Sequence, residues 1–122
     1  MAKNEKVLVF GASTNPDRYA HKATKALLNA GHEPVLVGLR DGVVSGISIQ
    51  KGQPDIEGVD TITMYVGPKH QPAQYDYLLS LNPKRIIFNP GTENEEFMKM
   101  AQTAGVEVVP ACTLVMLSLD NF

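Results

Sequence analysis

The sequence predicts an α/β protein with a three-layer α/β/α Rossmann-like fold, in which helices cover both faces of a mostly parallel sheet. Two observations carry this prediction. Short apolar runs alternate with helical patterns along the chain, and the first run, at 6–10, ends directly in Gly11. Such alternation is typical of βαβ units, whose crossovers are right-handed. We therefore expect a five-stranded sheet, with strand order about 3-2-1-4-5, in one domain spanning residues 1–122.

The first part of the chain predicts two strands joined by a helix. Residues 6–10 form a continuous apolar run, as expected of a strand that is buried on both faces. Apolar residues then recur at helical spacing from about 18 to 30, and Gly31 follows where a helix-ending glycine is common. Residues 34–37 supply the second strand.

The stretch 38–58 is the least regular part of the sequence. Glycines interrupt it repeatedly, and only residues 47–49 alternate like a strand. We interpret it as a long connection that carries a short extra strand. Loops of this length inside a compact domain are often functional.

The remaining residues repeat the alternation of strands and helices. The expected strands are 61–66, 85–88 and 106–109; the helices place apolar residues on one face at Tyr75, Leu78 and Leu79, and at Phe97, Met100, Ala101 and Ala104. Thr92 and Glu95 match the capping-box pattern and predict the start of the second of these helices. Residues 112–119 predict a short closing helix.

Composition excludes several classes of function. A formal charge of −2 and a pI near 5.9 argue against a nucleic-acid binder, which normally carries a basic excess. Cys112 is the one cysteine, so there is no internal disulfide, and no Cys/His spacing predicts a metal site. The start lacks the apolar core of a signal peptide, and no apolar stretch is long enough to span a bilayer. We expect a cytoplasmic protein without membrane contacts.

The predicted architecture indicates where a ligand would bind. In open α/β sheets, ligands bind at the carboxyl ends of the strands where the strand order reverses. With the expected order, that point lies between the first and fourth strands, where the loops 11–16 and 89–92 would meet. Both loops lead into helix N-termini, whose free N–H groups and dipole favour anions such as phosphate.

The glycine turn is only part of a dinucleotide motif. Gly11 matches the first glycine of G-x-G-x-x-G, but Ser13 and Pro16 occupy the other two positions, which disfavours NAD in its usual pose. Arg40 follows the second strand in place of the acidic residue that holds an NAD ribose. Its guanidinium suits a ribose phosphate, either the 2′-phosphate of NADP or the 3′-phosphate of coenzyme A; alternatively it is an ordinary solvated residue.

Residues 7–18, Val-Leu-Val-Phe-Gly-Ala-Ser-Thr-Asn-Pro-Asp-Arg, resemble the opening of the small stand-alone coenzyme A-binding proteins. That family is similar to the N-terminal domain of the succinyl-CoA synthetase α subunit. The resemblance continues through Val59-Asp60, Pro68 and the Asn94-Glu95-Glu96 helix start, and a cysteine after the last strand also recurs, here Cys112. It implies that the ligand is coenzyme A or an acyl-CoA.

The resemblance also implies which residues hold the ligand. The first loop would approach the phosphates, residues 37–40 would lie by the adenosine, residues 65–67 would line the same cleft, and residues 89–91 would border the pantetheine path. The implied binding residues are Gly11, Ala12, Ser13, Asn15, Arg18, Val37, Gly38, Arg40, Tyr65, Asn89, Pro90, Gly91 and Cys112. The chain departs from the family at Gly38-Leu39, where Asn-Pro is usual, and after Cys112.

No catalytic constellation emerges from the sequence. A triad needs a nucleophile, a base and an orienting group within hydrogen-bond reach, and no spacing predicts one. His32 is expected to be a surface cap, and His21 either meets a ligand phosphate or faces water. Cys112 is either a small packing residue or a thiol for exchange with the ligand's thiol.

We therefore favour a binding module that holds coenzyme A and has no catalytic or metal residues, and leave open whether the protein is an enzyme. Two alternatives remain: an NADP-binding oxidoreductase-type domain, and an interaction protein whose Rossmann fold has lost its ligand. The expected partner is a small-molecule nucleotide cofactor, not nucleic acid or membrane. A homodimer or a partner protein also stays open.

Overall fold

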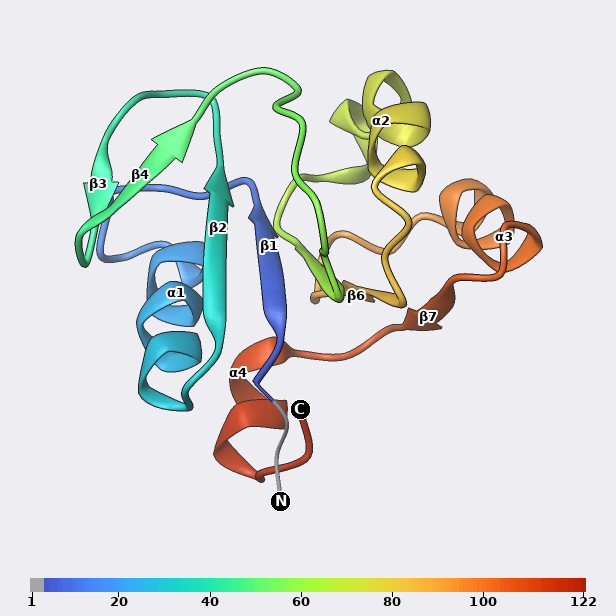
Figure 1. The fold of residues 1–122 in the computed structure, drawn as a ribbon. Helices are drawn as coiled ribbons and strands as arrows, with labels where there is room; N and C mark the ends of the chain where they lie inside the picture. Colours follow the sequence, from blue (N-terminus) through green and yellow to red (C-terminus); the bar gives the residue numbers. More distant parts are fainter. Residues whose placement is uncertain (1–3) are drawn as a thin grey trace.

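The computed structural model describes residues 4–122, which form one seven-stranded sheet between helices (Figure 1). The sheet order is β3-β4-β2-β1-β5-β6-β7, and every adjacent pair is parallel except the antiparallel β3–β4. The strands are β1 (Lys6–Phe10), β2 (Glu33–Val37), β3 (Val43–Val44), β4 (Ile47–Gln50), β5 (Thr61–Met64), β6 (Arg85–Phe88) and β7 (Glu107–Val109). The predicted α/β Rossmann-like class is confirmed.

Two helices cover each face of the sheet. They are α1 (Tyr19–Asn29), α2 (Tyr75–Ser80), α3 (Glu95–Thr103) and α4 (Thr113–Ser118), with short 3₁₀ turns at Pro68–His70 and Pro72–Gln74. Side chains of α1 and α4 pack in one hydrophobic core, and side chains of α2 and α3 pack in the other. The short closing helix predicted from 112–119 is confirmed as α4.

Strand β1 contributes to both cores, which explains its continuous apolar run. Leu8 and Phe10 point into the core with α2 and α3, while Val7 and Val9 point into the core with α1 and α4. Alternate side chains of a strand face opposite sides of the sheet, so a strand with helices on both faces is apolar at every position. This prediction from the sequence is confirmed.

The predicted number of strands, five, and their order, 3-2-1-4-5, are both wrong in detail, because the sheet has seven strands. The strand expected third in the chain, β5, pairs with β1 on the side away from β2, and β4 takes the place beside β2. All of β5 is buried, whereas β4 buries only Ile49 fully, so β5 belongs in the middle of the sheet and β4 near an edge. The order therefore reverses between β1 and β5.

The start of α3 also differs from its prediction. Asn94 is the N-cap, and its Oδ1 accepts a hydrogen bond from the Phe97 N–H at 3.2 Å. The hydroxyl of Thr92, the expected cap, instead donates to the Asn89 carbonyl oxygen at 2.8 Å. Asn caps helices as well as Thr does, and here it lies at the position where the backbone turns into the helix.

His32 is not the surface cap expected from its place after Gly31. It is buried, its Nδ1 accepts a hydrogen bond from the Glu5 N–H at 3.0 Å, and its ring lies 4.9 Å from the Phe122 ring. His32 therefore joins the start of β1 to the last residue of the chain.

Within residues 4–122, no helix combines the length and the apolar character needed to cross a membrane. The same residues contain no group of three or more His, Cys, Asp or Glu side chains arranged to hold a metal ion.

Candidate cofactor-binding site

The carboxyl ends of β1 and β5 meet where the strand order reverses, which is the usual ligand position in such sheets. Gly11 follows β1 with φ +100°, and a Cβ on it would lie only 3.0 Å from the Tyr65 carbonyl carbon. The Tyr65 N–H donates to the Phe10 carbonyl oxygen at 2.8 Å. Only glycine allows both the positive φ and this close approach. The tight turn at Gly11 therefore has a clear structural cause.

The end of β2 fixes the glycine turn from the other side. The N–H groups of Gly11 and Ala12 both donate to the Val37 carbonyl oxygen, at 2.8 and 2.9 Å. These two donors are therefore committed to the protein. The backbone N–H groups of Ser13 and Thr14 have no protein acceptor within residues 4–122, so they are the donors available to an anion.

The segment that joins this turn to α1 is held in shape by its own side chains. Ser13 Oγ accepts from the Asn15 N–H at 3.1 Å, and Asn15 Oδ1 accepts from the Asp17 N–H at 3.0 Å. His21 lies on the first turn of α1 with its Nδ1 3.1 Å from the Ser13 carbonyl oxygen, so Nδ1 is the donor, and Nε2 has no protein partner among residues 4–122.

The N-terminus of α1 is open toward the same loop. Arg18 occupies the N-cap position without a side-chain cap bond, and the first turn carries no acidic residue. The first N–H groups of a helix have no partner inside the helix, and the helix dipole makes this end favourable for negative charge. Together with the free donors of Ser13 and Thr14, this end can bind a phosphate.

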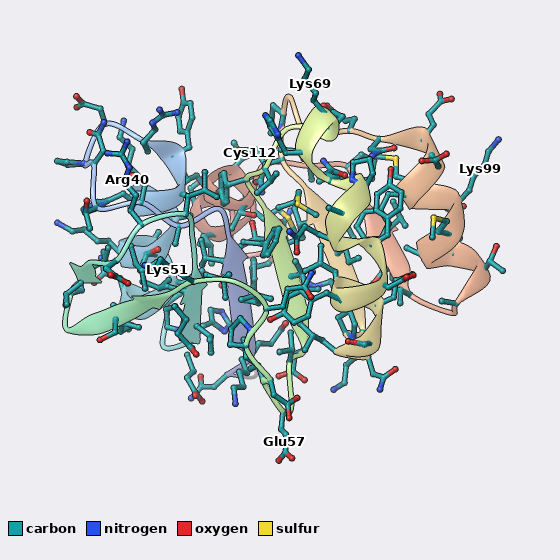
Figure 2. The ribbon with its side chains drawn as sticks, turned by 90° about the horizontal axis from the view of Figure 1, so that it is seen from above. Arg40, Lys51, Glu57, Lys69, Lys99 and Cys112 are labelled. Atoms are coloured by element: carbon teal, nitrogen blue, oxygen red, sulfur yellow. The ribbon has the colours of Figure 1, made fainter. Side chains whose placement is uncertain are left out.

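The loop after β2 packs directly onto the glycine turn. A Cβ on Gly38 would clash with the Ala12 carbonyl oxygen, and a Cβ on Gly42 would clash with the Thr14 methyl group. The departure from the family pattern at 38 thus has a packing reason, because only glycine fits there. Leu39 in this loop is 96% exposed, and the exposed Arg40 lies at the rim of the molecule in Figure 2.

Asn89, expected on the pantetheine path, lies beyond β5 at the end of β6. It is 3% exposed, and its amide nitrogen donates to Thr63 Oγ1 and to the Met64 carbonyl oxygen, both at 2.8 Å. Its Oδ1 accepts from the Thr113 N–H at 2.9 Å. Both amide hydrogens are used, so the side chain joins β5, β6 and α4. Pro90 and Gly91 follow it and are exposed.

Gln71 lies at the candidate site, although no sequence pattern selects it. Its side chain is fully buried, and its Nε2 donates to the carbonyl oxygens of Val66 and Thr92 at 2.9 and 2.8 Å. Its Oε1 accepts from Asn94 Nδ2 at 3.1 Å. Gln71 therefore clamps the loop after β5 to the loop after β6, and a glutamine in a loop carries no sequence signal for this role.

Tyr65 and Cys112 lie together where β5 ends and α4 begins. Burial raises the pKa of Tyr65 to about 12, while hydrogen bonding with the hydroxyls of Thr63 and Thr113 acts in the opposite direction. Cys112 is a free, half-buried thiol at the N-cap position of α4. It is close enough to Tyr65 to contribute to that rise, and Figure 2 places it near the middle of the edge.

The structure thus divides the predicted residues into two groups, apart from Cys112 at the start of α4. One group surrounds the ends of β1, β2 and β5: Gly11, Ala12, Ser13, Asn15, Arg18, Val37, Gly38, Arg40 and Tyr65. Asn89, Pro90 and Gly91 follow β6, one strand further away, so the loops 11–16 and 89–92 are not direct neighbours across the reversal point.

A family model described as CoA binding domain matches residues 5–118. This chain belongs to the CoA-binding domain family. The match includes every loop at the carboxyl edge described above. It agrees with the resemblance drawn from residues 7–18.

Two further proteins resemble this chain over most of its length. A crystal structure of an uncharacterised protein is 48% identical, covers 99% of this chain and 100% of its own, and superposes with a TM-score of 0.97. The uncharacterised protein YneT of Bacillus subtilis is 24% identical over 89% of this chain and 82% of its own length.

The same fold occurs as part of a larger protein. The dinucleotide-forming acetyl-coenzyme A synthetase 1 of Ca. Korarchaeum cryptofilum, solved in complex with phosphate and ADP, matches 88% of this chain with a TM-score of 0.73. This chain corresponds to 25% of that protein, at 19% identity, so the likeness is one of fold.

Proposed function

We propose that this protein binds coenzyme A, free or acylated, at the carboxyl edge of its sheet and acts as a binding module without chemistry of its own. The observation that carries the proposal is the family match over residues 5–118, which spans the glycine turn and the loops packed against it. The order of the strands supports the same location, because the reversal lies at Gly11 and Tyr65.

The diphosphate would lie over the loop after Ala12. The free N–H groups of Ser13 and Thr14 and the uncapped start of α1 supply donors, and Arg18 and His21 supply side chains at the same place. Gly11 and Ala12 would act by shaping this loop, since their N–H groups already bind the Val37 carbonyl oxygen.

The adenosine would lie against the loop after β2. Leu39 offers an exposed apolar side chain for a face of the adenine ring, and Arg40 offers a guanidinium for the 3′-phosphate of the ribose. The pantetheine arm would cross the end of β5 toward Tyr65 and Cys112. In this pose Asn89 is a positioning residue that holds the strand ends in place.

The direct test is a thermal-shift titration of the full chain with coenzyme A, dephospho-coenzyme A, NADP and NAD. A ligand present at 100 times its dissociation constant stabilises the folded state by about 2.7 kcal/mol, which raises the Tm by roughly 10 °C for a domain of this size. We expect the largest shift with coenzyme A. A shift with NADP alone would support the oxidoreductase-type alternative, and no shift with any ligand would support the interaction protein.

Two charge variants test the pose. Arg18→Ala should weaken coenzyme A and dephospho-coenzyme A equally, because both carry the diphosphate. Arg40→Ala should weaken coenzyme A by about tenfold and leave dephospho-coenzyme A nearly unchanged, in keeping with the loss of one charged hydrogen-bond partner. Lys99→Ala is the matched control, since Lys99 is exposed on α3, away from Arg40 (Figure 2). Equal effects of Arg40→Ala and Lys99→Ala would contradict the role of Arg40.

A further inference from the structure

Lys51 follows β4 and reaches the loop that carries Arg40. The Lys51 Nζ lies 3.4 Å from Asp41 Oδ2. The backbones are joined as well, because the Gly38 N–H donates to the Gln50 carbonyl oxygen at 2.9 Å. β4 runs parallel to β2, so Lys51 and the loop 38–41 emerge at the same edge of the sheet, on the same side as Arg40 in Figure 2.

The charges in this group bear directly on an anionic ligand. Arg40 and Asp41 are adjacent in the chain, so the negative charge of the Asp41 carboxylate opposes the attraction of this loop for a phosphate. Lys51 pairs with that carboxylate, so the three side chains together keep one net positive charge.

Stability gives little reason for this ion pair. The Lys51 and Asp41 side chains are 55% and 80% exposed, and exposed pairs contribute little to folding. Water and salt screen the charges of this exposed pair. The screening becomes weaker once a bound nucleotide covers part of the loop and excludes water. The pair therefore has more effect on the bound ligand than on the fold.

We propose that Lys51 is a specificity-determining positioning residue, which by holding Asp41 makes the rim select ligands with a ribose phosphate. This inference rests on the proposed function, because the phosphate is that of coenzyme A. Lys51 acts through Asp41: it holds the carboxylate away from the phosphate and offsets its charge, so that Arg40 binds the phosphate with its full positive charge.

Isothermal titration of the full chain with coenzyme A and dephospho-coenzyme A tests the proposal. Lys51→Ala should weaken coenzyme A by about threefold to tenfold and dephospho-coenzyme A by less than about twofold, as expected for a single partly screened charge. Lys51→Arg should retain the preference of the unchanged protein, because it keeps the charge and the reach to Asp41. The preference in the unchanged protein should fall as salt is raised.

Asp41→Asn provides the decisive second variant. Combined with Lys51→Ala it removes the repulsive carboxylate, and it should restore most of the preference for coenzyme A. A role limited to steadying the loop would not give this rescue. Lys99→Ala, on the opposite side of the molecule, is the control for loss of one surface charge and should bind both ligands as the unchanged protein does.

The possible failures are distinguishable. If the unchanged protein binds neither ligand, the proposed function is overturned and the inference about Lys51 falls with it. If it prefers coenzyme A and Lys51→Ala leaves the ratio of the two affinities unchanged, the inference about Lys51 alone is overturned. The inference about Lys51 is also overturned if Lys51→Ala weakens the binding of both ligands equally and Asp41→Asn does not restore the preference.

Discussion

At the scale of single residues, Gly38 determines how two loops of the site pack. A Cβ there would clash with the Ala12 carbonyl oxygen, and Ala12 cannot shift freely because its N–H donates to the Val37 carbonyl oxygen at 2.9 Å. We expect Gly38→Ala to lower the free energy of unfolding by about 1–3 kcal/mol, the usual cost of overpacking, and to weaken coenzyme A binding. Urea denaturation followed by circular dichroism measures the first effect.

Gly67→Ala is the matched control for Gly38→Ala. Gly67 also lies in a loop at the carboxyl edge, but its φ is −64° and a Cβ there would meet no atom within 4 Å. The control should change the free energy of unfolding by less than about 0.5 kcal/mol. Equal stability of the two variants would show that residue 38 has room for a side chain.

Tyr65 makes stability depend on pH in the alkaline range. Burial raises its pKa from 10.0 to about 12, so its neutral form is favoured in the folded protein. Below pH 10 the phenol is neutral in both the folded and the unfolded protein, so its contribution to the free energy of unfolding is complete. As the pH rises from 10 to 12, the unfolded chain ionises first and up to about 2 kcal/mol is lost.

Comparison of the unchanged protein with Tyr65→Phe measures this contribution. Urea unfolding at pH 9 and pH 11.5 should show a larger loss of stability for the unchanged protein than for the variant, which has no phenol to ionise at this position. The pKa values of Tyr75 and Tyr77 are also raised by burial, and both proteins share that part of the loss. Equal losses in the two proteins would contradict the shift at Tyr65.

The sequence identifies some of these residues and not others. The Gly11 turn follows from a buried strand that ends in glycine, a local pattern. The Gly11 and Ala12 N–H groups bind Val37 because β2 lies beside β1. No local sequence pattern reveals which strand is the neighbour. Gln71 and Lys51 act through residues distant from them in the chain or in another element, so nothing in their neighbourhoods sets them apart.

At the scale of elements, the helices and strands follow their sequence patterns, but their order in the sheet does not. Thr61-Ile62-Thr63-Met64 alternates polar and apolar residues, a pattern typical of a strand with one exposed face. Both threonines are nevertheless fully buried, because Arg85 donates to the Thr61 hydroxyl and Asn89 to the Thr63 hydroxyl, each at 2.8 Å. These partners come from β6 and the residue after it, so the central place of β5 is visible only in three dimensions.

The cap of α3 gives a prediction at this scale. Asn94 Oδ1 accepts from the Phe97 N–H, and Nδ2 donates to the Tyr75 hydroxyl oxygen at 2.8 Å. Asn94→Ala should therefore lower the free energy of unfolding by about 1–2 kcal/mol. Glu95→Ala should cost less than about 0.5 kcal/mol, because the Glu95 side chain makes no hydrogen bond or ion pair within residues 4–122 and acts through the dipole of the first turn. If chemical denaturation showed a larger loss of stability for Glu95→Ala than for Asn94→Ala, the capping box predicted from the sequence would be supported instead.

At the scale of the whole molecule, the two edges of the sheet have different roles. The carboxyl edge carries the loops of the proposed site. The amino edge carries a cluster of side chains that connects the start of β1 to the last residues of the chain. Arg85 donates to Glu5 Oε2 at 3.2 Å, and its guanidinium carbon lies 4.5 Å from the centre of the Phe122 ring. His32, directly before β2, contacts the same ring, and its Nδ1 accepts a hydrogen bond from the Glu5 N–H.

This separation predicts that the amino edge affects stability without affecting ligand choice. Phe122→Ala removes the ring between His32 and Arg85, and it should lower the free energy of unfolding by about 1–3 kcal/mol. The strands between the edges are about 15 Å long, more than the Debye length in physiological salt, and the sheet is buried on both faces.

The ratio of the affinities for coenzyme A and dephospho-coenzyme A should therefore be the same in Phe122→Ala as in the unchanged protein. Urea denaturation and isothermal titration on the same preparation measure both quantities. A loss of stability with a constant affinity ratio would mean that changes in the cluster at the amino edge do not reach the ligand edge through the sheet. A changed ratio would instead mean that α4, which begins at the ligand edge and leads to Phe122, transmits changes between the two edges.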